Sequence, residues 1–235
     1  MSIKVENLTK TYGNQKAVDG LSFEIGEQKI VGFLGPNGAG KSTTMKCITG
    51  ILPFEQGTIS ISGFNIQTDP LTAKRQIGFL PEHNPLYTDL YVKEILAYEA
   101  DLQQVKNKQR RIEEVIALTG LQLEQHKKIN QLSKGYRQRV GLALAIIHDP
   151  KVLILDEPTT GLDPNQILEI RNLIKELAKN KTVLLSTHIM QEVEAICDEI
   201  IILHKGILKI NLPLAEIKNQ QQDETVESLF VKLTN

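Results

Sequence analysis

The spacing of apolar residues in the first third of the chain predicts short β-strands. The segments rich in β-branched and aromatic residues, bounded by Gly, Asn or Asp, are IKVENLTKTYG (3–13), GLSFEI (20–25), KIVGFLG (29–35) and GTISISG (57–63). KIVGFLG is a nearly continuous apolar run, which is typical of a strand buried on both faces. QIGFLPE (76–82) has the same character. A sheet therefore begins early in the chain.

A helical period replaces this pattern from Val92 onward. The residues that form the apolar stripe are Val92, Ile95, Leu96, Leu102, Val105, Ile112, Val115 and Ile116. Residues 84–149 therefore predict a helical block, in which the basic segment KNKQRR (106–111) is expected to be a solvated helix face.

Strands and helices alternate after this block. KVLILDEP (151–158), KTVLLS (181–186) and EIIIL (199–203) predict strands, and residues 163–180 and 188–197 predict helices. Asp163 fits the N-cap of the first helix, with Pro164 at its first position. Its apolar face consists of Ile167, Ile170, Leu173, Ile174 and Leu177. The alternation indicates a parallel, layered α/β core that the helical block interrupts.

The last residues predict a short terminal helix. In DETVESLFVKLTN (223–235), Val226, Leu229, Phe230 and Leu233 recur at helical spacing, and docking on the body would keep them from water. We expect one domain over residues 1–235. Its parts are a core (1–83 and 150–210), a helical subdomain (84–149) and a C-terminal tail (211–235).

Composition favours an ordinary packed globule, with 41% hydrophobic and 23% charged residues and a net charge of −1. That charge gives no bulk attraction to nucleic acid or to an anionic membrane, so no nucleic-acid partner is expected. Cys47 and Cys197 are far apart in the chain and are expected to be core thiols in a reducing compartment, because they form no CxxC pair.

Nothing in the sequence predicts a membrane span or a signal peptide. The longest apolar run is about VGLALAII (140–147), far short of the roughly 20 residues that a spanning helix needs. The chain begins with the polar segment MSIKVENLTKTYG. We therefore expect a cytoplasmic protein that contacts a membrane through a partner.

GPNGAGKST predicts a phosphate-binding loop between a strand and a helix. Its residues are Gly35, Pro36, Asn37, Gly38, Ala39, Gly40, Lys41, Ser42 and Thr43. Glycines let backbone N–H groups converge on phosphate oxygens, and the helix N-terminus adds positive potential. Lys41 would reach the β- and γ-phosphates, and the Ser42 hydroxyl would bind Mg²⁺.

Two adjacent acids close a buried strand in VLILDEP. Asp156 is expected to bind Mg²⁺ directly or through its ligands, and Glu157 to polarise the water that attacks the γ-phosphorus. A pair of charges ending an apolar strand would be costly unless it met a metal or an open cleft, although a solvated strand end is the alternative.

The nucleotide is expected to be adenine-based. The chain's Asn-Lys pairs, at 107–108 and 180–181, lack the Asp of the Asn-Lys-x-Asp guanine reader. Tyr12, in KTYG, is either the residue that stacks on the base or an ordinary turn aromatic.

LSKGYRQR (132–139) predicts a second anion-binding segment, with a hydroxyl, a cation and a glycine in a row before an apolar run. Together with the preceding motifs it resembles one family, the ATP-binding subunits of ABC transporters. The similar segments, in order, are GPNGAGKST (Walker A), LPE at 80–82 (Q-loop), LSKGYRQR (signature), LILDEP (Walker B), GLDP at 161–164 (D-loop) and STH at 186–188 (switch histidine). The resemblance covers nearly the whole chain.

The resemblance implies a P-loop ATPase core with a mostly parallel sheet, an N-terminal antiparallel β subdomain and an inserted α-helical subdomain. It also implies that two subunits, identical or different, pair head to tail around two ATP-Mg²⁺. The signature loop of one subunit, Leu132, Ser133, Lys134, Gly135 and Tyr136, would close on the nucleotide held by the other. Asp163 would lie in the D-loop, His188 would contact the γ-phosphate, and multi-span membrane permease subunits would be the partners.

The motifs depart from the usual pattern at three positions. Lys134 and Tyr136 replace a Gly and the Gln of LSGGQ, and Glu82 replaces the Q-loop Gln. Glu82 either gives Mg²⁺ an oxygen or lies in a loop that mainly faces the membrane partner. These departures resemble subunits of ABC-2-type exporters, and IGFLPEHNPLYTDLYV (77–92) resembles the gliding-motility-associated ATP-binding subunits.

Two other functions agree less well with the sequence. A soluble ABC-type ATPase of DNA repair or translation usually carries long coiled coils, zinc modules or two fused ATPase units, and 235 residues show none of them. A P-loop kinase would leave the signature segment unexplained. A transporter motor is therefore the favoured reading. The sequence does not identify its cargo.

Overall fold

A four-stranded antiparallel sheet forms one layer of the protein. The computed structural model describes residues 1–220 and 225–234, and its first sheet has the strand order β2–β1–β4–β5. The strands are β1 (Ile3–Tyr12), β2 (Gln15–Ile25), β4 (Gln56–Ile61) and β5 (Phe64–Asn65). Each neighbouring pair is antiparallel, as expected for the N-terminal part of the chain.

A six-stranded sheet forms the centre of the molecule, in the order β10–β9–β3–β8–β7–β6. Its strands are β3 (Ile30–Leu34), β6 (Ile77–Leu80), β7 (Val152–Asp156), β8 (Thr182–Ser186), β9 (Glu199–His204) and β10 (Ile207–Pro213). All neighbours are parallel except β10, which runs antiparallel to β9. Every residue of β3, β7 and β8 is buried, which explains their continuous apolar runs.

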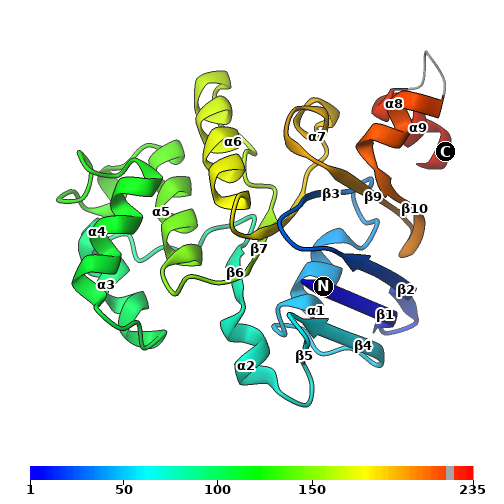
Figure 1. Ribbon diagram of the computed structural model, residues 1–235, viewed down its shortest axis with the longest axis horizontal. Helices are drawn as coiled ribbons and strands as arrows, with labels where there is room; N and C mark the ends of the chain where they lie inside the picture. The colour runs from blue at the N-terminus through cyan, green and yellow to red at the C-terminus, as the bar shows by residue number, and fades with distance from the viewer. Residues whose placement is uncertain (221–224, 235) are drawn as a thin grey trace.

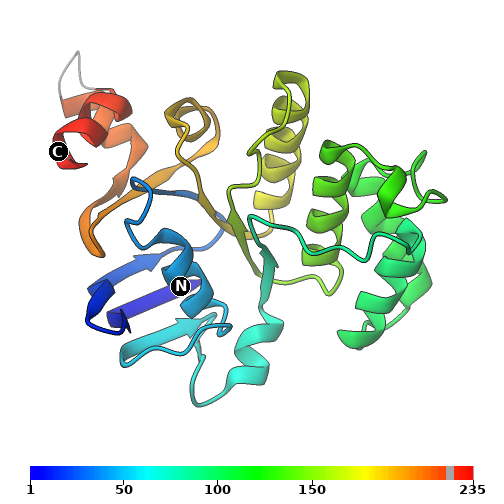
Figure 2. The ribbon, with the colours of Figure 1, turned by 180° about the vertical axis from the view of Figure 1, so that it is seen from behind.

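Helices pack against this sheet, and a group of helices lies to one side of it (Figure 1). The helices are α1 (Lys41–Ile48), α2 (Pro70–Arg75), α3 (Val92–Leu102), α4 (Lys108–Thr119), α5 (Lys134–Ile146), α6 (Pro164–Ala178), α7 (Met190–Ile196), α8 (Leu214–Gln220) and α9 (Val226–Thr234), with a 3₁₀ turn at Ile129–Gln131. In the front and rear views, α3, α4 and α5 lie together at the end opposite the C-terminus (Figures 1 and 2). Their treatment as a separate subdomain stays a prediction.

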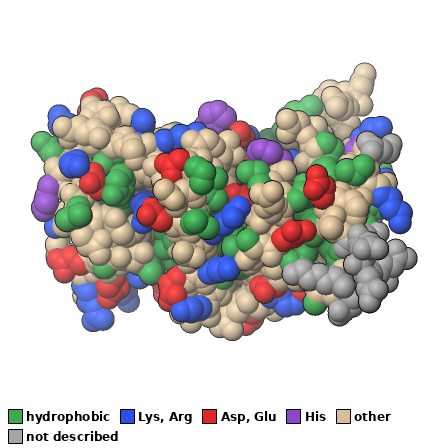
Figure 3. All heavy atoms as spheres, turned by 90° about the horizontal axis from the view of Figure 1, so that it is seen from above, with side chains coloured by type: hydrophobic (Ala, Val, Ile, Leu, Met, Phe, Trp, Pro, Cys, Tyr) green, Lys and Arg blue, Asp and Glu red, His purple; other side chains and the backbone are tan. Residues whose placement is uncertain are grey.

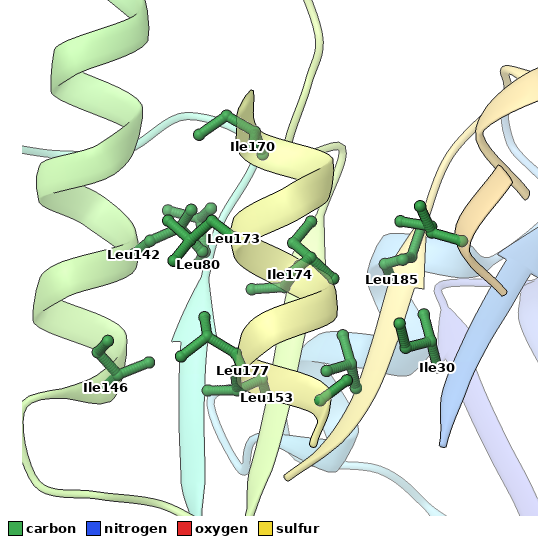
Figure 4. Packing of buried hydrophobic residues seen from close by; sticks show 14 of the residues in the cluster. Ile30, Leu80, Leu142, Ile146, Leu153, Ile170, Leu173, Ile174, Leu177 and Leu185 are labelled. Carbon is green, nitrogen blue, oxygen red and sulfur yellow. The ribbon is translucent and has the colours of Figure 1, made fainter. Parts of the chain in front are cut away.

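The pleat of the central strands divides the core between the two faces of the sheet. Along β7, Val152 and Ile154 pack in the cluster that joins the two sheets and α1, whereas Leu153 and Leu155 pack on the helical side. On that side α6 lies over the strands, with Leu173 and Leu177 near Leu153 and beside α5 (Figure 4). β7 is therefore packed on both of its faces.

The terminal helix is confirmed over Val226–Thr234, whereas residues 223, 224 and 235 of the predicted segment lie outside the described residues. Val226 and Leu229 are buried, and Phe230 and Leu233 are partly buried against the helical-side core. The helix packs on α7 and β9. This docking places α9 beside α7.

Some expectations were wrong in detail. Leu102 does not lie on the buried stripe but is 59% exposed, because α3 ends there and Ala100 fills the core position. Ile167 is only partly buried, near the start of α6. KNKQRR is not wholly solvated, because the Arg111 guanidinium donates to the carbonyls of Ile146 (2.6 Å) and Ile147 (3.0 Å) at the end of α5.

Charge is evenly spread on the face seen from above, where basic and acidic side chains alternate without a large patch of one sign (Figure 3). Among the described residues, no helix combines the length and the hydropathy that a transmembrane segment requires.

The two thiols are expected to be unreactive in the folded protein. Both are buried and free, and burial raises the pKa of Cys47 from 9.0 to about 11 and raises that of Cys197 as well. The higher pKa leaves about 100-fold less thiolate at neutral pH for Cys47. Ellman's reagent should label neither thiol in native protein and both after unfolding in guanidinium. Rapid reaction of one equivalent in native protein would contradict the burial.

Candidate active site

The loop between β3 and α1 is shaped by glycines that no other residue could replace without strain. Gly40 has φ +101°, and a Cβ there would lie 2.4 Å from the Ala17 carbonyl oxygen. A Cβ on Gly35 would lie 2.6 Å from the carbonyl oxygen of Leu203. The loop is thus pressed against two neighbouring segments, and it leads directly into the N-terminus of α1. Backbone N–H groups at such a helix start favour phosphate oxygens.

Lys41 provides a buried cation at this loop. Its side chain is 7% exposed, and its ammonium donates to the carbonyls of Gly35 (2.6 Å) and Pro36 (3.3 Å). Burial lowers the pKa of Lys41, and the nearby carboxylates of Glu157, Asp156 and Glu82 oppose that shift. This ammonium is suited to bind phosphate, because charge-assisted hydrogen bonds from a cation to phosphate oxygens are strong.

The Asp156 carboxylate links three elements. It is 3% exposed at the end of β7, and its Oδ1 accepts hydrogen bonds from Ser42 (3.3 Å) on α1 and Ser186 (2.6 Å) on β8. Asp156 and Ser186 are register partners in the parallel pair, so the bond follows from the sheet itself. A carboxylate and a hydroxyl placed in this way are oxygen donors of the kind that Mg²⁺ prefers.

Glu157 and His188 face one another across the end of the sheet. Glu157 has φ +52°, which turns the chain sharply after β7, and its N–H donates to Ser186 Oγ (2.9 Å). Its Oε2 accepts from the Thr160 hydroxyl (3.0 Å) and lies 2.9 Å from His188 Nδ1. A strained backbone at a carboxylate that contacts a histidine is typical of a catalytic position.

A cavity of about 430 Å³ brings most of the predicted residues together. Its lining residues are Tyr12, Gln15, Ala17, Asn37, Gly38, Ala39, Gly40, Lys41, Ser42, Thr43, Glu82, Glu157, Thr160 and His188. Tyr12 is half exposed at the rim, with the Lys10 ammonium 5.6 Å from its ring centre. Glu82 is 46% exposed at its side chain.

Gln15, Ala17 and Thr160 were missed by sequence reasoning. Gln15 and Ala17 reach the loop because β2 folds over it, and no local pattern predicts that approach. Larger cavities exist, including one of about 650 Å³ that Lys4 and Lys151 line, but its lining includes neither the glycine-rich loop nor the acid pair.

The signature segment lies outside this cavity in its own chain. Ser133 is the N-cap of α5 and accepts from Tyr136 N–H (3.4 Å), and both Ser133 and Lys134 are exposed. Gly135 is buried, since a Cβ there would meet the Gln166 side chain at 2.6 Å. Leu132 is buried and Tyr136 packs against the core. None of residues 132–136 lines the cavity described above.

Asp163 also lies apart from the cavity lining. It caps α6 as predicted, with its Oδ1 accepting from Gln166 N–H (3.0 Å), and its side chain is exposed. Its position beside Gln166, which covers Gly135, places the D-loop and the signature segment on neighbouring surface.

The chain is similar in sequence to a known protein family. A family model described as "ABC transporter" matches residues 18–160. The bacitracin transport ATP-binding protein BcrA of Bacillus licheniformis is 40% identical over 222 residues, which are 94% of this chain and 72% of that protein.

Two solved structures have the same fold. One is described as the ATP-binding subunit of an ABC transporter, with a TM-score of 0.89 and 32% identity over 100% of both chains. The other is a dimer of the ATP-binding cassette MJ0796 bound to ADP and Pi, with a TM-score of 0.81 and 28% identity over 90% of this chain and 98% of that one. The expected α/β fold is thereby confirmed, and the chain belongs to the ABC transporter family as an ATP-binding subunit that hydrolyses ATP.

Proposed function

We propose that this chain is the motor subunit of an ABC-2-type exporter, which pairs with a second ATP-binding subunit around two ATP-Mg²⁺ and drives membrane subunits between conformations. The observation that carries the proposal is the division of its anion-binding segments. Lys41, Glu157 and His188 line one cavity, whereas Ser133 and Lys134 lie exposed outside it. Each chain then supplies the cavity of one ATP site and, with its exposed Ser133 and Lys134, the opposite side of the other ATP site.

The backbone of the loop at residues 35–43, of which residues 37–43 line the cavity, and the Lys41 ammonium bind the phosphates of ATP, and Tyr12 stacks on the base. On binding, Lys41 exchanges its contacts with the Gly35 and Pro36 carbonyls for phosphate oxygens. The half-exposed ring of Tyr12 at the rim supports its place against a planar base.

The residues present fit Mg²⁺. Ser42 Oγ and Asp156 Oδ1 are 3.3 Å apart beside the cavity, and Mg²⁺ bound to a nucleotide needs only one or two such protein oxygens besides phosphates and water. The described residues accordingly hold no cluster of three or more His, Cys, Asp or Glu suited to a metal cage. Bound there, Mg²⁺ neutralises charge that develops on the phosphate oxygens.

Glu157 acts as the general base. Its carboxylate takes a proton from the water whose oxygen bonds to the γ-phosphorus, and the bond from that phosphorus to the ADP oxygen breaks. His188 holds Glu157 Oε2 at 2.9 Å from Nδ1, which leaves the other ring nitrogen for the γ-phosphate. Thr160 fixes the same carboxylate oxygen from the other side (3.0 Å).

The second subunit completes the site. The exposed Ser133 hydroxyl, the Lys134 cation and the N-terminus of α5 form an anion-binding surface for the partner's nucleotide, and neither Ser133 nor Lys134 lines the nucleotide cavity of its own chain. The similar MJ0796 cassette is a dimer bound to ADP and Pi, which supports such pairing. Asp163 lies beside this surface, where two subunits would meet.

An apolar groove supports a membrane partner. A cavity of about 680 Å³ is lined by Leu86, Tyr87, Thr88, Asp89, Leu90 and Tyr98, with the rings of Tyr87 and Tyr98 6.1 Å apart. We assign this hollow to a membrane subunit because its exposed tyrosine rings and its partly buried leucines offer apolar contact beside the polar Thr88 and Asp89. The groove begins four residues after Glu82, at Leu86, so a permease bound there would connect through this short segment to the nucleotide site and keep the subunit at the cytoplasmic face of the membrane.

A role in transport is supported by the relative named for bacitracin transport, and the export direction stays a prediction. A gliding-motility role rests on the resemblance of residues 77–92 alone and stays a prediction.

Replacing Glu157 with Gln tests the proposed base. The amide keeps an oxygen for Thr160 and His188 but takes up no proton, so hydrolysis should slow roughly 10²–10⁴-fold while ATP binding is retained. Phosphate release and calorimetric ATP titration measure the two quantities, and the ATP-bound dimer should persist on a sizing column. Near-normal turnover in the variant is incompatible with this role for Glu157.

Glu82 is tested by comparing two substitutions. If its oxygen binds Mg²⁺, Glu82→Gln should retain most of the Mg²⁺-dependent activity and Glu82→Ala should need a higher Mg²⁺ concentration, because only Gln keeps an oxygen. The measurement is ATPase rate against Mg²⁺ concentration. Identical curves for the two variants would exclude a magnesium contact and leave the loop with a role in facing the membrane subunit.

A further inference from the structure

The side chain of Glu192, in the first turn of α7, is enclosed by the two loops that follow β7 and β8. It is 1% exposed, and each carboxylate oxygen accepts a hydroxyl hydrogen bond. Oε1 accepts from Thr159, and Oε2 accepts from Thr187 at 2.6 Å. A carboxylate so deeply buried is tolerated only because both of its oxygens are hydrogen-bonded and a cation lies nearby.

That cation belongs to α6. Arg171 Nη2 lies 3.6 Å from Glu192 Oε1, and both side chains are largely enclosed. The ion pair balances the charge of Glu192 and connects the carboxylate to the helix that begins at the D-loop. The arrangement therefore joins three neighbouring segments at one buried point.

The two threonines lie close in the chain to the proposed catalytic residues. Thr159 lies two residues after Glu157, and Thr187 lies directly before His188. The Thr187 hydroxyl also accepts from Ile189 N–H (3.1 Å), so its own proton is directed to Glu192. Both threonine side chains are buried. Neither threonine nor Glu192 lines the nucleotide cavity, so these residues act on the chemistry only through their neighbours.

We propose that Glu192 is a positioning residue for ATP hydrolysis. It binds the loop after β7 to the loop after β8, and thereby holds Glu157 Oε2 and His188 Nδ1 at 2.9 Å. The proposal rests on the roles assigned above to Glu157 and His188. Its physical basis is that both catalytic side chains leave strand ends on short irregular segments, where small shifts of backbone change a reacting geometry steeply.

The test replaces the hydroxyls rather than the buried acid, because valine has the shape of threonine without its donor. In Thr159→Val and in Thr187→Val, kcat for ATP should fall about 10-fold or more, while KM for ATP stays within about twofold. Thr159→Ser and Thr187→Ser keep the hydroxyl and should restore at least about half of kcat. Circular dichroism and the melting temperature of each variant establish that it is folded at the assay temperature.

Thr119→Val is the matched control. Its hydroxyl is equally buried and donates to the Val115 carbonyl (2.7 Å) within α4, remote from the cavity. The same chemical change should lower the melting temperature without lowering kcat. Glu192→Gln gives a second measurement: it keeps one acceptor oxygen and should fall between the wild type and the valine variants in kcat.

The outcomes separate positioning from a structural role. Folded valine variants with kcat within about twofold of the wild type overturn the proposal, as do serine variants that are as slow as the valine variants or a KM that rises in step. Glu157→Gln is run in the same assay. If its turnover is lost while the valine variants are normal, only the positioning role of Glu192 is wrong. If Glu157→Gln turns over normally, the assigned base is wrong, and this inference falls with it.

Discussion

At the carboxyl end of β7, the Asp156 carboxylate accepts hydrogen bonds from Ser42 at the start of α1 and from Ser186 at the end of β8. A buried charge in this position is stable only while those donors stay in place. Because β3, β7 and β8 are parallel neighbours, their carboxyl ends meet at one edge of the sheet. The glycine-rich loop, the acid pair and the histidine are therefore brought together by the sheet.

The contacts around Glu157 depend on that arrangement. Ser186 donates to Asp156 and accepts from Glu157 N–H, so one hydroxyl binds the Asp156 carboxylate and also stabilises the turn at Glu157. His188 and Thr160 then meet the Glu157 carboxylate. Glu192 lies one step further out, where it bonds to the threonines that flank both segments. The further a contact lies from the sheet, the harder it is to predict from the sequence.

The position of the candidate site was predictable where a few consecutive residues form it. The glycines and Lys41 form one loop, and Asp156 and Glu157 end one apolar run. Asp163 followed by Pro164 predicts a helix start, which is where α6 begins. Contacts between segments that are distant in sequence were not predictable in this way. Gln15 and Ala17 reach the cavity only because β2 folds over the loop, and the burial of Glu192 requires three segments distant in sequence.

Some local signals were present but unused. Asp69 and Pro70 begin α2 as Asp163 and Pro164 begin α6, and the Asp69 side chain accepts from Thr72 N–H in the same manner. Leu208, Ile210 and Leu212 alternate with exposed residues in β10, the pattern of a half-buried strand. In the other direction, Leu102 matched a helical stripe by spacing but lies at the end of α3, beyond the core.

The central claim is that one chain carries half of each of two ATP sites, and subunit mixing tests it most directly. Lys41→Ala damages the P-loop half and Ser133→Arg damages the signature half, so each variant alone should be nearly inactive. Mixed dimers then contain one site with both defects and one sound site. Random pairing makes about half of the dimers mixed, so up to roughly a quarter of normal ATPase activity should return.

A covalently linked dimer with a single damaged P-loop measures whether one sound site can work alone. If that linked dimer is active and the mixture of Lys41→Ala with Ser133→Arg regains activity, the shared-site account holds. If the linked dimer is active and the mixture, with both variants folded and exchanging subunits, remains inactive, then Ser133 serves the nucleotide of its own chain and the account is contradicted.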